Sequence, residues 1–184
     1  LASSSSLVSS SSLASSSSVL SSSSLASSSH SSQPALALEE NILGSDGSFS
    51  LGQQNFASYF NDAAKPSAVS WNNEVVVTLD AFSTDVWHAQ IQHEVKVEAN
   101  QVYTVCFDAV AEAERTIEFS IDGNEDSQYA IFNAVAVGAE PEPVVSSITT
   151  EKQQLQYTFN ASATDATARF ILSVGQSDTN IRFD

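Results

Sequence analysis

The sequence lacks methionine and contains one cysteine, three histidines and six basic residues among its 184 residues. Because Cys106 is the only thiol, it cannot form an internal disulfide or a site with two or four cysteine ligands, and cysteine usage leaves the redox compartment open. The six basic residues stand against 22 acidic ones, which gives a formal charge of −16. A surface this acidic repels phosphate backbones, so we expect no nucleic-acid partner.

Long hydrophobic runs are also missing. No stretch approaches the roughly 20 consecutive apolar residues that span a bilayer, so we expect no membrane partner. No basic segment precedes an apolar one, so no signal peptide is recognisable. The sequence begins at Leu1 and contains no methionine, and we interpret it as a piece of a longer chain.

Residues 1–34 have a composition of their own, because 21 of the first 32 residues are serine. The segment repeats every six residues, a period that fits neither an α-helix nor a coiled coil. A hexapeptide β-helix is an alternative, but the repeats lack turn glycines and bulky packing residues. Serine-rich segments bury too little apolar surface to offset their ordering entropy. We therefore predict a disordered, flexible linker over 1–34 and one folded domain over 35–184.

The folded domain is predicted to be all-β, because its apolar and polar residues alternate with the period of a strand. Runs of this kind recur at spacings typical of a sandwich and lie at residues 75–79, 87–93, 102–111, 115–121, 129–137, 155–159, 169–174 and 180–183. The pattern predicts an antiparallel β-sandwich of the jelly-roll type.

One predicted strand face carries His88, Gln90 and Gln92. Amides and an imidazole are suited to recognising hydroxyl-rich ligands, because they offer both donors and acceptors. The alternative interpretation is an ordinary polar outer face of a sheet.

Several segments in the right order resemble carbohydrate-binding modules of family 4 and its relatives in families 9, 16 and 22. They are Asn41–Leu43, Gly47–Gly52, Asp85–Gln90, Val97–Ala109, Ala168–Gly175 and Ile181–Asp184. One departure is Asn100, at a turn where the family prefers glycine and where asparagine tolerates the left-handed region.

The resemblance implies a non-catalytic jelly roll that binds a single polysaccharide chain in a cleft across its concave sheet. The expected ligand is β-1,3-glucan such as laminarin first, then β-1,4-glucan, mixed-linkage glucan or xylan. The resemblance further implies a secreted, monomeric module that targets a covalently attached polysaccharide-degrading enzyme to its substrate.

The cleft residues implied by the resemblance, together with the amide-bearing strand face, are Trp87, Gln90, Gln92, Glu118, Tyr129, Arg169 and Ser173. Aromatic rings would stack on sugar rings, while amides, carboxylates and guanidinium would bind hydroxyls. Trp87 and Gln90 are three positions apart, so a regular strand cannot point both the same way. A bulge, or a tryptophan at the cleft edge, would resolve this conflict.

Each assignment has a structural alternative. Trp87 could belong to the core, Tyr129 could be an aromatic at a strand edge, and Arg169 could pair with a surface carboxylate. His88 and His93 are interpreted as polar surface residues rather than ligands.

The resemblance also implies a structural calcium ion away from the cleft. Its ligands would fall on Asp184, Ser50 and Glu74. Calcium requires about 6–8 oxygen ligands, and serine at position 50 replaces an acidic ligand of the family, which should weaken the site.

Two other classes of function remain open in the sequence. A glycosidase needs two carboxylates roughly 5–10 Å apart, and pairs such as Glu94/Glu98, Glu112/Glu114 and Glu125/Asp126 are candidates only because acidic residues are abundant. An adhesion or structural β-sandwich domain without glycan specificity is the second alternative.

Overall fold

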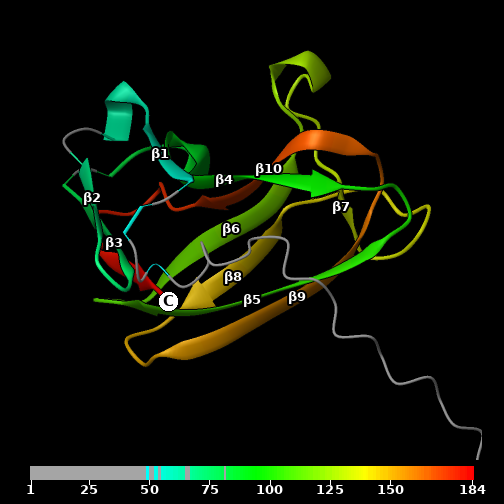
Figure 1. The fold of residues 1–184 in the computed structure, drawn as a ribbon. Helices are drawn as coiled ribbons and strands as arrows, with labels where there is room; N and C mark the ends of the chain where they lie inside the picture. Colours follow the sequence, from blue (N-terminus) through cyan, green and yellow to red (C-terminus); the bar gives the residue numbers. More distant parts are fainter. Residues whose placement is uncertain (1–48, 50–51, 54, 65–66, 81) are drawn as a thin grey trace, which may run out of the picture. The chain divides into compact units, whose positions relative to one another are not determined.

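The computed structural model describes residues 49, 52–53, 55–64, 67–80 and 82–184, and these residues form two antiparallel sheets that pack face to face. Figure 1 shows the two layers, with β4 and β10 in one and β5 and β9 in the other. The predicted all-β sandwich is thereby confirmed, whereas the predicted linker over 1–34 lies outside the described residues.

The first sheet has five strands in the order β1 (Phe56–Phe60), β4 (Ala89–Val97), β10 (Asp165–Ser173), β6 (Arg115–Asp122) and β8 (Val144–Ile148). The second has six strands in the order β2 (Ser67–Trp71), β3 (Val75–Leu79), β11 (Ile181–Phe183), β5 (Val102–Ala111), β9 (Gln153–Ala161) and β7 (Asn133–Ala134). Short 3₁₀ turns lie at Asp62–Ala64, Val86–His88 and Glu125–Ser127. Within the described ranges, no helix has the length and apolar character needed to cross a membrane.

The core lies between the sheets and is rich in aromatic rings. Phe119 of β6 is fully buried, and its ring centroid lies 5.1 Å from Tyr157, 5.5 Å from Phe170 and 6.0 Å from Phe159. Burial of such side chains is the main favourable contribution to folding. The core therefore fixes which face of each strand points inward.

The strand predictions were correct where alternation was strong. The bounds predicted for 75–79 and 102–111 are those of β3 and β5, and β6, β9, β10 and β11 overlap their predicted runs. Strands β1, β2 and β8 were not predicted from the sequence. The five residues of β2 include two serines and an alanine, so their alternation carries little hydrophobic contrast.

The predicted strand over 129–137 was wrong. Gln128 and Tyr129 have φ values of 55° and 57°, and two consecutive left-handed residues are incompatible with a strand. The segment instead begins with a turn, after which Ile131 forms an isolated bridge with Asp122 and Asn133–Ala134 forms the short strand β7. Asn100 has a φ of 65°, which confirms the left-handed turn predicted there.

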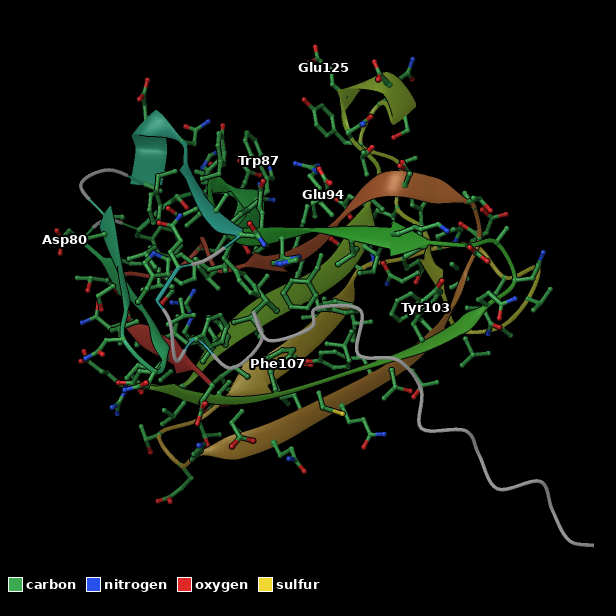
Figure 2. The ribbon with its side chains drawn as sticks, viewed as in Figure 1. Asp80, Trp87, Glu94, Tyr103, Phe107 and Glu125 are labelled. Carbon is green, nitrogen blue, oxygen red and sulfur yellow. The ribbon has the colours of Figure 1, made fainter. Side chains whose placement is uncertain are left out.

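The outer face of the five-stranded sheet is organised in rows of side chains that lie opposite one another on neighbouring strands. Two rows matter here and read Tyr59–Gln90–Ser173–Glu118 and Glu94–Arg169–Asp122. In Figure 2, Trp87, Glu94 and Glu125 lie on the outer side of β4, whereas Phe107 lies on its other side, between the layers. The register therefore gathers polar and aromatic side chains on one face.

We predict that Phe119→Ala destabilises the domain by about 3–5 kcal/mol, because a large ring is lost from a packed core. Val145→Ala serves as the control, since Val145 is 62% exposed and its truncation should cost less than about 0.5 kcal/mol. The free energy of unfolding of each variant is measured by urea denaturation. Equal losses for the two variants would contradict this description of the core.

Candidate functional site

A groove of about 520 Å³ lies on the outer face of the five-stranded sheet, within the size range of ligand sites. Its lining residues are Tyr59, Trp87, Gln90, Gln92, Asp122, Tyr129 and Arg169. Five of these were predicted from the sequence, namely Trp87, Gln90, Gln92, Tyr129 and Arg169. The structure thus brings together residues that are up to 110 positions apart in the chain, from Tyr59 to Arg169.

The polar side chains of the groove form a continuous chain of hydrogen bonds. Nη1 of Arg169 lies 3.5 Å from Oε1 of Gln92, whose Nε2 donates to Oε1 of Gln90 at 2.7 Å. Nε2 of Gln90 in turn donates to Oγ of Ser173 at 3.1 Å. Each amide therefore has a defined orientation, and its remaining donor and acceptor capacity points in a fixed direction.

Arg169 is the basic residue among those that line the groove. Its guanidinium carbon lies 5.0 Å from the centroid of the Tyr129 ring, and its Nη2 donates to the carbonyl oxygen of Gly123 at 3.2 Å. Its Nε is buried and has no hydrogen-bond partner among the residues that the structure describes. Stacking on an aromatic ring holds the planar cation in place while leaving donor capacity unused.

Asp122 is a groove residue that was not predicted from the sequence. It lies opposite Arg169 in the strand register. Burial raises the pKa of Asp122, while a hydrogen bond from Ser120 and the charge of Arg169 act in the opposite direction. Its buried Oδ1 has no hydrogen-bond partner within the described part of the chain. The alternation of Glu118 and Ser120 could have identified Asp122, but the predicted strand over 115–121 ended one residue before it.

Tyr59 is the second groove residue that was missed, because β1 was not predicted. It lies opposite Gln90 in the register and is 42% exposed. Its partial exposure at the groove gives the site a third aromatic side chain beside Trp87 and Tyr129.

Trp87 lies on the 3₁₀ turn Val86–His88 immediately before β4, and it is 46% exposed. This position resolves the three-residue spacing between Trp87 and Gln90, because only Gln90 belongs to the strand. The alternative that Trp87 is a core residue is wrong. Trp71, whose ring centroid lies 5.9 Å from that of Phe56, is the tryptophan that packs against the core.

The family model described as a carbohydrate binding domain matches residues 43–179. This range holds the sandwich strands up to β10 and every residue that lines the groove. The chain belongs to this family of carbohydrate-binding domains. The prediction of a non-catalytic carbohydrate-binding module is thereby confirmed.

Solved structures with the same fold include carbohydrate-binding modules of low sequence identity. A CBM4 structure shares 19% identity and a TM-score of 0.62, over 76% of this chain and 94% of that one. The N-terminal cellulose-binding domain of Cellulomonas fimi β-1,4-glucanase C shares 20% identity and a TM-score of 0.55, over 76% and 90%. The CBM22-1 xylan-binding domain of Paenibacillus barcinonensis Xyn10C shares 17% identity and a TM-score of 0.50, over 75% and 87%. A comparison with curated proteins finds no match.

Two predicted site residues of this carbohydrate-binding domain do not line the groove. Ser173 is buried and acts as the acceptor at the end of the hydrogen-bond chain. Glu118 lies opposite Ser173 on β6, four residues before the groove residue Asp122, and burial raises the pKa of its carboxyl.

The interpretation of His88 and His93 as surface residues was wrong. Both are buried, with exposures of 8% and 7%. His93 points into the core, where its ring meets that of Phe56 at 4.6 Å. His88 belongs to the 3₁₀ turn rather than to the Gln90 face, and its ring lies perpendicular to that of Trp87 at 4.3 Å. His88 had been assigned to the polar face of Gln90, whereas His93 is in phase with the buried Ala89 and Ile91.

Two of the residues predicted to bind calcium, Glu74 and Asp184, lie at the ends of β3 and β11, which are inner strands of the other sheet. The carboxylate of Asp184 pairs with Nζ of Lys152 at 3.0 Å, and that of Glu74 lies 4.0 Å from Nη1 of Arg182. No group of three or more His, Cys, Asp or Glu side chains suited to a metal occurs among the described residues. These residues alone do not fit a calcium ion. Ser50 lies outside the described residues, and the calcium site stays a prediction.

The raised pKa of Asp122 predicts a pH-dependent effect of Asp122→Asn on stability. A carboxyl whose pKa is raised on folding stabilises the fold below its ordinary pKa of 3.8, and this contribution is lost as pH rises through the raised value. Relative to wild type, Asp122→Asn should therefore gain stability between about pH 4 and pH 7. Urea denaturation of both proteins across this range is the measurement. A relative loss over the same range would mean that pairing with Arg169 outweighs burial.

Proposed function

We propose that the groove binds a single chain of a neutral β-glycan, with β-1,3-glucan as the first candidate and β-1,4-glucan, mixed-linkage glucan or xylan next. The observation that carries this proposal is one groove containing aromatic rings, a fixed pair of amides and a guanidinium beside a carboxylate. These are the chemical groups that a chain of hydroxyl-bearing rings requires.

The aromatic side chains supply surfaces for the apolar faces of sugar rings. Trp87 and Tyr129 are 46% and 54% exposed, and large aromatic groups left in water contribute to affinity when a ligand covers them. Tyr59, on the edge strand β1, adds a further apolar surface to the groove.

The polar side chains supply selectivity for hydroxyl groups. Gln90 and Gln92 are already oriented by their mutual hydrogen bond, so little rotamer entropy is lost when they bind a ligand. The amide groups of Gln90 and Gln92 keep donor and acceptor capacity beyond the hydrogen bonds that orient them. A ligand without hydroxyls would leave such groups unpaired, which disfavours its binding.

The charge of the chain supports a neutral ligand. With a formal charge of −16, the protein repels polyanions at long range. Within the groove, the positive charge of Arg169 is balanced by the carboxyl group of Asp122. The similar structures carry the names of both a cellulose-binding and a xylan-binding domain, so they do not choose between linkages. The preference for β-1,3-glucan rests on the family resemblance.

The serine-rich segment over 1–34 precedes the folded domain in the sequence. We propose a secreted, monomeric module whose serine-rich segment over 1–34 tethers it to a polysaccharide-degrading enzyme. The support is the composition of that segment, which is typical of flexible linkers between modules.

We predict that laminarin retards the domain in affinity electrophoresis and that Trp87→Ala weakens this binding at least tenfold, because stacking energy is lost. The variant should lose less than about 1 kcal/mol of stability, since Trp87 is half exposed and outside the core. Barley glucan and xylan are tested beside laminarin, and alginate serves as the polyanionic control. Affinities are measured by titration calorimetry and stabilities by thermal denaturation.

Val102→Ala is the matched control, because Val102 is 53% exposed on a strand of the other sheet and should leave binding unchanged. Binding to none of the soluble polysaccharides would overturn the proposal and favour an adhesion or structural domain. Release of reducing sugar would indicate an enzyme instead. Joint loss of folding and binding in Trp87→Ala would mean that this residue supports the fold.

Calcium is a separate proposal. Its support is the family resemblance and the neighbouring positions of Glu74 and Asp184, at the ends of the paired strands β3 and β11. Calcium added to chelator-treated protein should raise the melting temperature, because a ligand that binds only the folded state stabilises it. Asp184→Asn should abolish this increase, whereas Asp80→Asn should retain it. An unchanged melting temperature in the wild type would remove calcium from the description.

A further inference from the structure

Trp87 is carried by a three-residue 3₁₀ turn rather than by a strand, so the sheet does not by itself fix its position. Short 3₁₀ segments have poor hydrogen-bond geometry and little stability of their own. An aromatic platform must nevertheless be held within about 0.5 Å to be effective in binding. The contacts that hold this turn are therefore as important as the ring itself.

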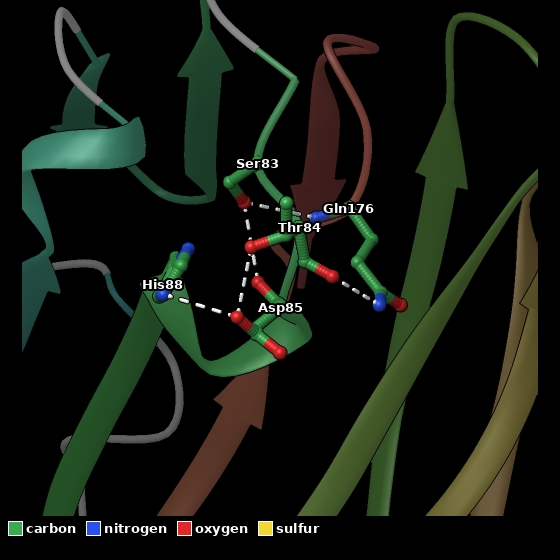
Figure 3. Close-up of polar contacts among 5 residues, drawn as sticks. All are labelled: Ser83, Thr84, Asp85, His88 and Gln176. Atoms are coloured by element: carbon green, nitrogen blue, oxygen red, sulfur yellow. Dashed lines mark hydrogen bonds and ion pairs between the residues drawn. The ribbon is translucent and has the colours of Figure 1, made fainter.

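The loop that follows β10 supplies these contacts (Figure 3). The amide of Gly175 donates to the carbonyl oxygen of Val86 at 2.7 Å. The Gln176 side chain donates through Nε2 to the carbonyl oxygen of Thr84 at 2.6 Å, and its backbone amide donates to Oγ of Ser83 at 3.2 Å. Three hydrogen bonds thus join two consecutive loop residues to the segment that leads into Trp87.

The backbone of this loop approaches the turn so closely that no side chain fits at position 175. A Cβ atom on Gly175 would lie 2.3 Å from the carbonyl oxygen of Asp85 and 2.7 Å from that of Val86. Both neighbours are backbone atoms, which cannot move aside without displacing the turn. Glycine is therefore required for the contact.

Gln176 adopts a backbone conformation that favours glycine, with a φ of 56°. Non-glycine residues in the left-handed region carry a conformational cost and commonly mark positions where the side chain has a role. Gln176 is exposed, so burial of its side chain does not explain its presence. The hydrogen bond from Nε2 of Gln176 to the carbonyl oxygen of Thr84 explains why glutamine occupies this position.

The other side of the same loop is held by a buried arginine. Arg115 of β6 is 5% exposed, and its guanidinium donates to the carbonyl oxygens of Val174, Thr179 and, at 3.3 Å, Gly175. Burial lowers the pKa of Arg115 to about 10, with Asp178 opposing, so the group remains charged at neutral pH. The loop is thus anchored to the sheet before it contacts the turn.

We propose that Gly175 and Gln176 form a clamp that positions Trp87, so that they control glycan affinity without contacting the ligand themselves. The clamp runs from Arg115 through this loop to the Thr84 and Val86 carbonyls. This inference rests on the proposed function of the groove, because it assigns the clamp to an aromatic platform for glycan.

The test uses Gln176→Gly, which removes the side-chain bond while relieving the left-handed backbone. Relief of the backbone offsets the greater freedom of glycine in the unfolded chain, so the melting temperature should stay close to that of wild type. Affinity for laminarin should fall about three- to tenfold, as expected when one side chain must be ordered on binding. Gln176→Met, which keeps the length but has no donor, should show the same loss.

The spectroscopic readout uses fluorotryptophan, because the chain has two tryptophans and hence two fluorine resonances. In Gln176→Gly the resonance of Trp87 should shift or broaden, while that of Trp71 stays in place. Asn100→Gly is the matched control, since Asn100 is another exposed left-handed residue, with a φ of 65°, that does not contact the turn. It should change neither resonance nor affinity.

The outcomes separate the clamp from the proposed function. If wild type binds a glycan and Gln176→Gly alters neither affinity nor the Trp87 resonance, the clamp is wrong. If Gln176→Gly lowers the melting temperature and moves both resonances, the residue supports the fold as a whole and the clamp is again wrong. If wild type binds no glycan, the proposed function fails, while the Trp87 resonance still reports whether the loop holds the turn.

Discussion

Burial of one apolar core between two sheets is the constraint on which the rest of this domain depends. A shift of one residue in β6 would move Ile117, Phe119 and Ile121 out of the core and would place Thr116 and Glu118 there instead. The free-energy cost of this exchange fixes the register of the strand. Because side chains alternate, the residues on the outer face are then fixed as well. The hydrophobic core therefore determines the positions of polar side chains that do not touch it.

The outer face uses this fixed register to order its polar groups before any ligand arrives. Hydrogen bonds link four side chains across β10 and β4, in the order Arg169, Gln92, Gln90 and Ser173. Side chains that are already ordered lose little entropy on binding, so a larger share of each new hydrogen bond contributes to affinity. The pairing of Arg169 with Tyr129 adds a contact from outside the sheet, and thereby connects the strand rows to the turn that carries the tyrosine.

The part of this arrangement that lies on regularly alternating strands could be predicted from the sequence. Gln90 and Gln92 were placed correctly because β4 alternates regularly, whereas Asp122 was missed because the predicted strand over 115–121 ended one residue before the end of β6. His93 is in phase with Ala89 and Ile91 on the core face of β4, but its polar ring atoms led to its interpretation as a surface residue, although the ring packs against Phe56. The left-handed backbone at Tyr129 depends on local hydrogen bonds within the loop that begins at Asn124. Hydrophobic periodicity carries no information about such bonds.

The side chains of the groove are therefore positioned in two different ways. Gln90, Gln92 and Arg169 lie on strands, where the core sets their spacing, while Trp87 and Tyr129 lie on turns, where local contacts set it. Changes in the turns leave the core unaltered, so the angle and separation of the aromatic rings can vary while the sandwich persists. Since linkage determines how successive sugar rings are tilted, discrimination between glycans on this fold is expected to depend on the turns more than on the strands.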